Sequence, residues 1–595
     1  MSQNLFADMR DQVVAALTAL LPDLPEALIA RVEVTPTRDP AHGDMATNAA
    51  MVAAKASGQN PRALAGALAE ALSALPLLAS AEPAGPGFVN LRLSPAALLG
   101  QVPVILRAGE SYGDSAAGAG TRVNVEYVSA NPTGPMHIGH CRGAVVGDAL
   151  AAVMAKAGYD VTTEYYINDA GGQVQALAWA AYWRYLQAAG SAITAEEFEA
   201  RTPSGLQYRG EYLIPVGEAL FHECGAALAA PGLGVADPAL WFETVRKQAL
   251  SMMLAAIRED LALLGVQQKV FSSEAALIAS GAADRAIEGL AAKGLIYEGV
   301  LEPPKGKTPD DWEPRPQTLF RATDFGDDVD RPLRKSDGSN TYFANDIAYH
   351  ADKIARGADI LIDILGADHG GYVSRMKAVV KAVSDGRVPL EVVLCQIVHV
   401  MRGGQPVRMS KRAGTFVTLR DLLEEVGRDA VRFTMLMRKS DAQMEFDLDQ
   451  AVAQTRENPV FYVQYAHARC RSVLRAATET LGGAAVAPEA LATADLSALD
   501  DAQELALVRA LINWPRLVEG AAQAREPHRV AFFLYDLAGE FHMLWNRGRD
   551  DSTLRFLQAD DPEGTLARLA LVSATATVLR SGLQLLGVTP AEEMR

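Results

Sequence analysis

The pattern that most restricts the fold is a strand, a turn, a helix and a second strand between residues 122 and 167. Arg122–Val128 and Val161–Ile167 have the length and apolar composition of strands, and the stretch from about Ile138 to Lys156 has the spacing of a helix closed by Gly158. Two strands joined through a helix form a right-handed βαβ unit with parallel strands. We therefore expect an α/β domain that opens here.

Two later apolar segments, Ala358–Gly366 and Leu390–Val400, are suited to the same sheet, buried on both faces. In an open parallel sheet, ligands bind beyond the carboxyl ends of the strands. Each of the four segments ends in or leads into polar groups, which are Glu126, Ser129, Asn131, His137 and His140 for the first, Asn168 and Asp169 for the second, Gly366, Asp368 and His369 for the third, and Arg402 for the fourth. These groups predict one shared site.

The chain is long enough, at 595 residues, for three or four domains. Residues 1–118 are expected to be helices with a short strand at Gly87–Ser94, and a Gly/Ser/Ala-rich stretch marks a boundary near residue 118. The α/β domain would cover 119–454, with an insertion at about 174–340 that interrupts the sheet. From residue 455 the amphipathic pattern indicates an all-α bundle.

Composition excludes several classes of function. The net charge of −17 argues against a protein that coats nucleic acid with a general basic surface, so any polyanion must be met locally. The four cysteines form no CxxC pair, so neither a disulfide framework nor a cysteine-built zinc site is expected, and a reducing cytoplasm fits. No uncharged apolar run reaches the ~20 residues of a membrane span.

The turn "NPTGPMHIGH", residues 131–140, is typical of a phosphate site. The start of a helix offers unpaired N–H groups and a positive dipole end. Gly134 and Gly139 would let a large anion approach the backbone, and His137 and His140 would add donors. The alternative is a Gly/Pro turn whose histidines cap the helix or fill a gap.

A second candidate phosphate-binding segment is "RMSKRAG", which brings the cations Arg408, Lys411 and Arg412 together after a strand. Such a cluster would neutralise charge that builds on a departing pyrophosphate. On its own, a run of this kind is most often a solvated surface. Its position after a sheet strand favours the functional interpretation.

Two carboxylates are candidate binding groups for a cationic substrate. Glu126 lies in an otherwise buried strand, where an unpaired charge would cost several kcal/mol, so it requires a cation. Asp346 is the second, with Tyr342 one helical turn earlier on the same face. The alternatives are an internal salt bridge from Glu126 to an arginine, and an ordinary helix surface for Tyr342 and Asp346.

"HIGH" at 137–140 and "MSK" at 409–411, about 270 residues apart, together resemble the paired signatures of class I aminoacyl-tRNA synthetases. The segments "VEYVSANPTGPMHIGH", "YYINDAGGQ", "YRGEYL", "ANDIAYH", "GADHGGYVSRMKA", "MSKRAGTFVTLRDLLEEVGRDAVRF" and "LRSGLQLLGVTPAEEM" resemble the arginyl-tRNA synthetases over nearly the whole chain. The resemblance implies a Rossmann-like catalytic domain with an inserted lobe, an α+β N-terminal domain that contacts tRNA, and a C-terminal helical domain of the DALR type that reads the anticodon.

The resemblance also implies roles for individual residues. The catalytic residues would be His137, His140 and Lys411. ATP would be bound by Pro132, Thr133, Gly134, His137, Gly139, His140, Gly366, Asp368, His369, Met409, Ser410, Lys411 and Arg412. Arginine would be bound by Glu126, Ser129, Asn131, Tyr342 and Asp346, and tRNA by Phe88, Asn90, Arg469, Trp545 and Arg547.

The chain departs from the family pattern at four positions. Arg408 stands where the family signature usually has Lys, and Arg412 where it has Ser. Lys is a compact point charge and Arg a planar fork, so the role of Arg408 is open. Gly172 and Gly370 stand where Asn and His are common, so no side-chain contacts are carried over to them.

The implied function is a ligase that activates L-arginine with ATP to arginyl-adenylate and transfers it to the 3′ end of tRNA(Arg), releasing AMP and pyrophosphate. Mg2+ would accompany the nucleotide, no protein-bound zinc is expected, and the enzyme would be a cytoplasmic monomer. One alternative is a class I synthetase for another amino acid or a related adenylyltransferase. Another is a tRNA-binding paralogue without catalysis.

Overall fold

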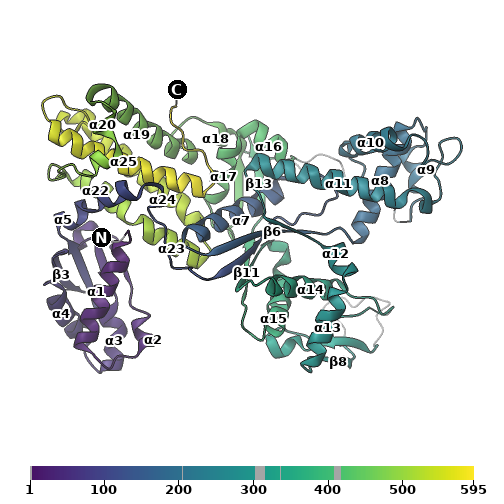
Figure 1. Ribbon diagram of the computed structural model, residues 1–595, viewed down its shortest axis with the longest axis horizontal. Helices are drawn as coiled ribbons and strands as arrows, with labels where there is room; N and C mark the ends of the chain where they lie inside the picture. Colours follow the sequence, from purple (N-terminus) through teal and green to yellow (C-terminus); the bar gives the residue numbers. More distant parts are fainter. Residues whose placement is uncertain (1–2, 204, 302–314, 336, 408–416, 595) are drawn as a thin grey trace. The chain divides into compact units, whose positions relative to one another are not determined.

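The computed structural model describes residues 3–203, 205–301, 315–335, 337–407 and 417–594. The chain forms two compact units (Figure 1). The first comprises residues 1–117, 152–158 and 453–595, and the second comprises residues 118–151 and 159–452.

The centre of the second unit is a five-stranded sheet in the order β12-β11-β5-β6-β7. All neighbouring strands are parallel. The strands are β5 (Arg122–Glu126), β6 (Asp160–Ile167), β7 (Val270–Ser273), β11 (Ile360–Gly366) and β12 (Leu390–Cys395). Because β6 lies on one side of β5 and β11 on the other, the strand order reverses at β5, and ligands bind at such a switch point. The predicted α/β sheet is confirmed.

Two details of the sheet differ from the prediction. The expected strand at 390–400 is two strands, because the chain leaves the sheet after Cys395 and exposes Ile397 (64% exposed). The second piece, β13 (Val398–Arg402), pairs with β14 (Gln405–Pro406) and β15 (Met444–Asp447) in a separate sheet. Strand β7 was not predicted, since its four residues, Val-Phe-Ser-Ser, form no apolar run that marks a buried strand.

Helices surround this sheet and form the inserted segments. They are α7 (Ile138–Lys156), α8 (Gly172–Ala188), α9 (Ala195–Glu199), α10 (Ile214–Cys224), α11 (Pro238–Leu264), α12 (Glu274–Ala279), α13 (Ala282–Ala292), α14 (Tyr342–Ala355), α15 (Val373–Val383), α16 (Leu419–Val426), α17 (Arg428–Leu436) and α18 (Leu448–Val452). Helix α7 follows β5 and precedes β6, as predicted for the βαβ unit.

The segment predicted as an insertion at 174–340 has several parts. Helices α8, α9, α10 and α11 gather into one lobe (Figure 1) around stacked aromatic rings, with Tyr182 and Trp241 centroids 3.7 Å apart. The segment then returns to add β7 to the main sheet, and β8 (Ile296–Gly299), β9 (Gln317–Phe320) and β10 (Arg331–Pro332) form a small antiparallel sheet. The insertion therefore contributes to the sheet that it interrupts.

The first unit contains an antiparallel sheet and a group of helices. The sheet has the order β1-β2-β4-β3, from β1 (Val34–Pro36), β2 (Met45–Thr47), β3 (Leu78–Ala84) and β4 (Phe88–Leu93). The N-terminal helices are α1 (Leu5–Leu20), α2 (Glu26–Ile29), α3 (Ala49–Ser57), α4 (Pro61–Leu72), α5 (Pro95–Leu99) and α6 (Gln101–Ala108). The C-terminal helices are α19 (Pro459–Leu481), α20 (Gly483–Val486), α21 (Pro488–Leu491), α22 (Ala502–Ile512), α23 (Trp514–Ala524), α24 (His528–Asp550) and α25 (Pro562–Leu585).

Two helices of the described chain, α7 and α25, are long and apolar enough to span a membrane by length and composition alone. Their apolar stretches are 67% and 83% buried inside the protein. Burial of this extent is what a core helix shows, because an apolar helix that packs against others on every side needs no lipid.

Candidate functional site

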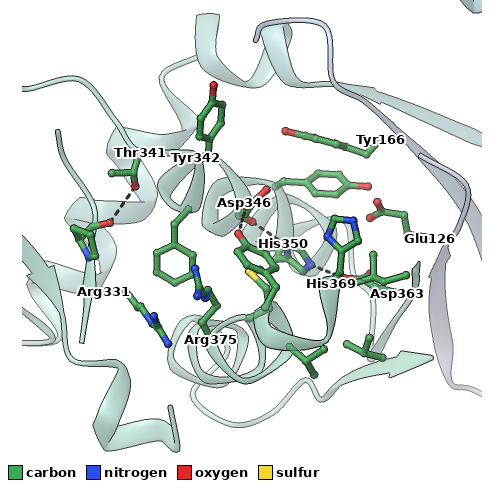
Figure 2. Close-up of a pocket in the computed structure, with 18 residues that line it drawn as sticks. Glu126, Tyr166, Arg331, Thr341, Tyr342, Asp346, His350, Asp363, His369 and Arg375 are labelled. Carbon is green, nitrogen blue, oxygen red and sulfur yellow. Dashed lines mark hydrogen bonds and ion pairs between the residues drawn. The ribbon is translucent and has the colours of Figure 1, made fainter. Parts of the chain in front are cut away.

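A cavity of about 550 Å3 lies at the carboxyl ends of β5, β11 and β12, beside the switch point of the sheet. Glu126 comes from the end of β5 and Asp363 from β11, and Tyr342 and Asp346 come from α14. Figure 2 shows Glu126 and Asp363 on one side of the cavity and Arg331 on the other. The cavity is large enough for an amino acid, and its wall includes three carboxylates, the rings of four tyrosines and one phenylalanine, and the side chains of Arg331 and Arg375.

Helix α14 brings two of the predicted residues into this cavity. Its N-cap is Thr341, whose hydroxyl accepts a hydrogen bond from the Ala344 N–H at 3.3 Å. Tyr342 is the first residue of the helix and Asp346 lies one turn later, so both face the cavity, as the i, i+4 spacing predicts. Tyr342 is 64% exposed at the cavity rim, whereas Asp346 is partly buried.

Asp346 is an acid that lacks a cation. The hydroxyl of Tyr372 donates a hydrogen bond to its carboxylate, and the residues that the structure describes form no ion pair with it. The pKa of Asp346 is raised to about 6, mainly by burial, with the charges of Glu274 and Glu126 adding to the increase and the Tyr372 hydrogen bond and the His350 charge opposing it. A positively charged group in the cavity would relieve this unfavourable burial.

Glu274 is a buried acid near Asp346 that the sequence analysis did not single out, and it is not among the residues that line the cavity. It begins α12 directly after β7, is 4% exposed, and accepts a hydrogen bond from the Asn345 side chain at 3.2 Å. Burial raises the pKa of its carboxyl group, and its charge raises the pKa of Asp346, so the two acids lie near each other. Recognising β7 would have placed Glu274 at the carboxyl edge of the sheet with the other polar residues.

Glu126 lines the cavity but already has a cation. The buried amine of Lys353 forms an ion pair with it and a second with Asp363 at 3.0 Å. The Ser129 hydroxyl donates to the other Glu126 oxygen at 2.8 Å. The alternative of an internal salt bridge is therefore the arrangement found, with a lysine in place of the arginine considered from sequence.

The backbone after β5 is strained. Val128 and Ser129 have φ angles of 74° and 40°, in the left-handed region that non-glycine residues rarely adopt. For a β-branched valine this costs on the order of 1–3 kcal/mol, and such strain concentrates at functional sites. Here it turns the chain so that Ser129 contacts Glu126 and also accepts the Tyr166 N–H at 3.0 Å.

The two histidines of the turn bond to the start of α7. The Gly139 N–H donates to Nδ1 of His137 at 3.1 Å, and the His137 N–H donates to Nδ1 of His140 at 3.3 Å. Their rings lie 4.0 Å apart. Because each Nδ1 accepts, each Nε2 carries the proton of the neutral ring. The capping alternative thus describes the Nδ1 atoms, which accept hydrogen bonds from backbone N–H groups at the start of α7.

A side chain at Gly139 or Gly134 would crowd neighbouring residues. A Cβ on Gly139 would lie 2.8 Å from Cε1 of His137, and one on Gly134 would lie 3.2 Å from the Tyr212 ring. Tyr212 comes from the inserted segment, and its hydroxyl donates to the Thr133 carbonyl at 2.8 Å. Tyr212 was not among the predicted site residues, since only the fold brings it to this turn.

Removal of the Tyr212 hydroxyl is expected to weaken binding of a phosphate-containing ligand at this turn. Tyr212→Phe leaves the Thr133 carbonyl without its donor, at a cost of about 1–3 kcal/mol if no water replaces it, so the Kd of such a ligand should rise about fivefold or more. The matched control is Tyr182→Phe, which removes a hydroxyl bonded to the Leu228 carbonyl within the helical lobe. Equal effects of the two variants on this Kd would contradict this role.

Five predicted residues, Arg408, Met409, Ser410, Lys411 and Arg412, lie outside the described residues. The flanks of their segment are described. Before it, the Val407 N–H donates to the Val400 carbonyl at 2.8 Å. After it, Thr418 pairs with His137 in an antiparallel bridge, and the Leu419 N–H donates to the Met136 carbonyl at 2.9 Å. The described residues Thr418 and Leu419 therefore lie beside the histidine turn.

Most of the remaining predicted site residues do not line the cavity. His369 lines the cavity, whereas Asp368 and Asn131 are exposed and Gly366 lies at the end of β11, and none of these three contributes to the cavity wall. Pro132 and Thr133 belong to the histidine turn. A Cβ would meet nothing within 4 Å at Gly172 and only Leu394 at 3.8 Å at Gly370, so packing does not require glycine at either position.

The predicted tRNA contacts lie on exposed or partly exposed surfaces of the first unit. Phe88 and Asn90 alternate with buried residues of β4, so they share its outer face. Arg469 lies over the Trp545 ring at 4.7 Å. Arg547 already forms an ion pair with Asp501 at 2.7 Å, which reduces its value as a phosphate contact.

Comparison with known proteins identifies the family. Residues 7–93 match the arginyl tRNA synthetase N-terminal domain, residues 101–195 the catalytic domain of class I (R) tRNA synthetases, and residues 463–594 the DALR anticodon binding domain. The arginine–tRNA ligase of Gluconobacter oxydans is 65% identical, with 99% of this chain and 98% of the relative covered. That of Cereibacter sphaeroides is 58% identical over the whole of both chains. The chain belongs to the arginyl-tRNA synthetase family.

Solved structures agree. The crystal structure of a putative arginyl-tRNA synthetase from Campylobacter jejuni is 28% identical with a TM-score of 0.70, over 84% of this chain and all of the other. The Thermus thermophilus arginyl-tRNA synthetase, 21% identical, shares the fold with a TM-score of 0.72 over 99% of this chain and all of the other. The predicted fold class is confirmed, and the chain is an enzyme that charges tRNA(Arg) with arginine. A non-catalytic paralogue and a synthetase for another amino acid are not supported.

Proposed function

We propose that the enzyme binds arginine in the cavity with the guanidinium group at Asp346 and Glu274. Burial raises the pKa of both acids, the charge of Glu274 also raises the pKa of Asp346, and no described residue forms an ion pair with either of them. A guanidinium is always charged and donates in a planar fork, which suits two carboxylates with Tyr342 beside them. Asp346, an acid without a cation in a cavity, is the observation that carries the proposal.

The amino acid end of arginine would then face the turn after β5. Its carboxylate must reach the α-phosphate of ATP, and Ser129 and Asn131 lie on the chain that leads from Glu126 into the histidine turn. Glu126 keeps lone pairs beyond those used by Lys353 and Ser129, so the α-ammonium of the substrate can still donate to it. Asp346 and Glu274 would therefore bind the guanidinium group of arginine, and Glu126 would bind its α-ammonium group.

ATP would place its phosphates at the start of α7, where Pro132, Thr133, Gly134 and Gly139 shape the turn and the Nε2–H groups of His137 and His140 donate. Gly366, Asp368 and His369 would face the nucleotide from the end of β11, and Met409, Ser410, Lys411 and Arg412 from the segment that ends beside His137.

The chemistry would need no protein nucleophile. The arginine carboxylate attacks the α-phosphate, pyrophosphate leaves, and the arginyl-adenylate is passed to the 3′-terminal ribose of tRNA(Arg). The protein contributes orientation of the two substrates and positive charge where negative charge builds, from His137, His140 and Lys411. ATP would arrive as its Mg2+ complex, with the phosphates as the main ligands.

For tRNA, we propose that residues 1–118 contact the body of the molecule through Phe88 and Asn90. Residues 455–595 would read the anticodon with Arg469, Trp545 and Arg547, and residues 119–454 would carry the catalytic site. Aromatic rings beside guanidinium groups are typical of surfaces that bind single-stranded RNA. The enzyme would act as a monomer in the cytoplasm, and arginine activation would await tRNA.

A neutral isostere of arginine tests the guanidinium site. Citrulline keeps the shape of arginine but has a urea group without charge, so it would leave Asp346 and Glu274 buried without a cation. Pyrophosphate exchange in the presence of tRNA(Arg) should favour arginine over citrulline by at least about 1000-fold in kcat/KM. Discrimination of less than tenfold would show that these acids do not read the side chain.

The charge of Asp346 predicts a pH dependence. Its pKa is raised to about 6 by burial, with Glu274 and Glu126 adding to the increase and the Tyr372 hydroxyl opposing it, so the group is protonated below that pH and ionised above it. Because a guanidinium binds the ionised form, kcat/KM for arginine should rise about tenfold per pH unit below pH 6 and level off above pH 7. The Asp346→Asn variant should lack this inflection. A flat wild-type profile between pH 5 and 7 would contradict the assignment.

A further inference from the structure

Lys353 is a buried lysine for which the proposed reaction has no direct task. Its side chain is 0% exposed, and its amine lies between the carboxylates of Glu126 and Asp363 and 4.4 Å from the Tyr349 ring centroid. Burial lowers the pKa of a lysine, but here Asp363, Glu126 and Glu164 together raise it above its usual value. Lys353 is therefore an ammonium ion held inside the protein.

His350 extends this cluster. Its Nε2 lies 2.9 Å from the Asp363 carboxylate and its Nδ1 lies 2.8 Å from the backbone carbonyl of Asp346. Both neighbours are acceptors, so both ring nitrogens must donate, which only the imidazolium form can do. Burial opposes that charge, but Asp363 raises the pKa of His350 overall. The ring thus ties the backbone of Asp346 to β11.

The spacing on α14 explains how one helix reaches all of these groups. Asp346, His350 and Lys353 follow one another by four and three residues, so they form a single stripe on the helix face that meets the sheet. Glu126 and Asp363 are direct register partners on the adjacent strands β5 and β11. Two carboxylates so placed repel each other, and the stripe supplies two cations that balance them.

We propose that Lys353 and His350 are positioning residues for arginine binding. They hold α14 against β5 and β11, so that Asp346 faces the cavity, and they neutralise Glu126 and Asp363. As a result, the guanidinium is bound by the acids that lack a cation, Asp346 and Glu274, and not by Glu126. The inference rests on the proposed placement of arginine.

The central test is Lys353→Met, which keeps the length of the side chain and removes its charge. His350 would then be the only cation of the α14 stripe left to balance the charges of Glu126 and Asp363. KM for arginine should therefore rise by about 50-fold or more, while KM for ATP changes less than threefold. The matched control is Lys293→Met, which removes a lysine paired with Asp385 at 2.7 Å away from the cavity. The control should leave both KM values within twofold of the wild type.

The double variant Lys353→Met/Asp363→Asn separates charge balance from simple packing. It removes one positive and one negative charge together, so Glu126 and His350 remain balanced, and KM for arginine should lie within tenfold of the wild type. If Lys353 only filled space, the losses in arginine-binding free energy from the two single substitutions would add in the double variant. If Lys353→Met does not fold, as judged by its thermal unfolding, the double variant decides alone, and an increase of more than tenfold overturns the proposal.

Asp346→Asn, measured in parallel, distinguishes the positioning role of Lys353 and His350 from the proposed placement of arginine. If it raises KM for arginine and Lys353→Met changes that KM less than threefold, the positioning proposal is wrong and the placement of arginine stands. If Asp346→Asn leaves KM for arginine unchanged, the placement of arginine is wrong, and the positioning proposal falls with it.

Discussion

Asp346→Asn is expected to raise KM for arginine by about two orders of magnitude. The substitution keeps the size of the side chain and its contact with Tyr372 but removes the charge that the guanidinium would neutralise. Loss of one partner of a buried ion pair costs about 3 kcal/mol or more, which corresponds to roughly 150-fold in binding. The measurement is pyrophosphate exchange at varied arginine concentration, with ATP and tRNA(Arg) saturating.

The control for this substitution lies on the same helix. Asp352→Asn removes a carboxylate of α14 that is 40% exposed and pairs with Arg356 at 2.8 Å. Exposed pairs of this kind contribute about 1 kcal/mol or less, so KM for arginine should change less than threefold. An Asp346→Asn enzyme with the arginine KM of the Asp352→Asn control would remove Asp346 from the substrate site.

Lys411→Ala is expected to lower kcat by about 100- to 1000-fold and to leave KM for arginine within threefold. Its charge would act mainly on the pyrophosphate as it leaves, and a group that binds more strongly in the transition state than in the ground state affects kcat. The measurement is single-turnover formation of the adenylate with saturating ATP and arginine. Lys411 lies outside the described residues, but its segment ends at Thr418, which pairs with His137.

A suitable comparison is Lys247→Ala, which removes a lysine that is 72% exposed on α11. That variant should keep the wild-type kcat. If Lys411→Ala instead weakened ground-state ATP binding as much as it lowered the rate of the chemical step, the lysine would be a binding residue and not one that stabilises the transition state.

The parts of the fold that could be predicted are those set by local pattern. Strands β5, β6 and β11 are apolar runs, α7 has helical spacing, and the turn between β5 and α7 carries its glycines and histidines in one continuous stretch. Tyr342 and Asp346 are one helical turn apart, so their shared face followed from the sequence alone. In each of these cases the interacting residues are neighbours in the chain.

The parts that could not be predicted depend on contacts between distant residues. The partner of Glu126 is Lys353, which is 227 residues later in the chain, and Tyr212 reaches Thr133 across 79 residues. Neither pairing has a local signal. Strand β7 was missed because two of its four residues are serines, and with it Glu274 was missed. The break after Cys395 was missed because the apolar residues continue from one sheet into the next.

The most direct measurement is a crystal structure of the enzyme with arginine and a non-hydrolysable ATP analogue. The guanidinium should lie within ~3 Å of the Asp346 carboxylate, with the triphosphate at the start of α7 within hydrogen-bond distance of His137 or His140. A guanidinium paired with Glu126 in place of Lys353, or phosphates bound away from that helix start, would contradict the account.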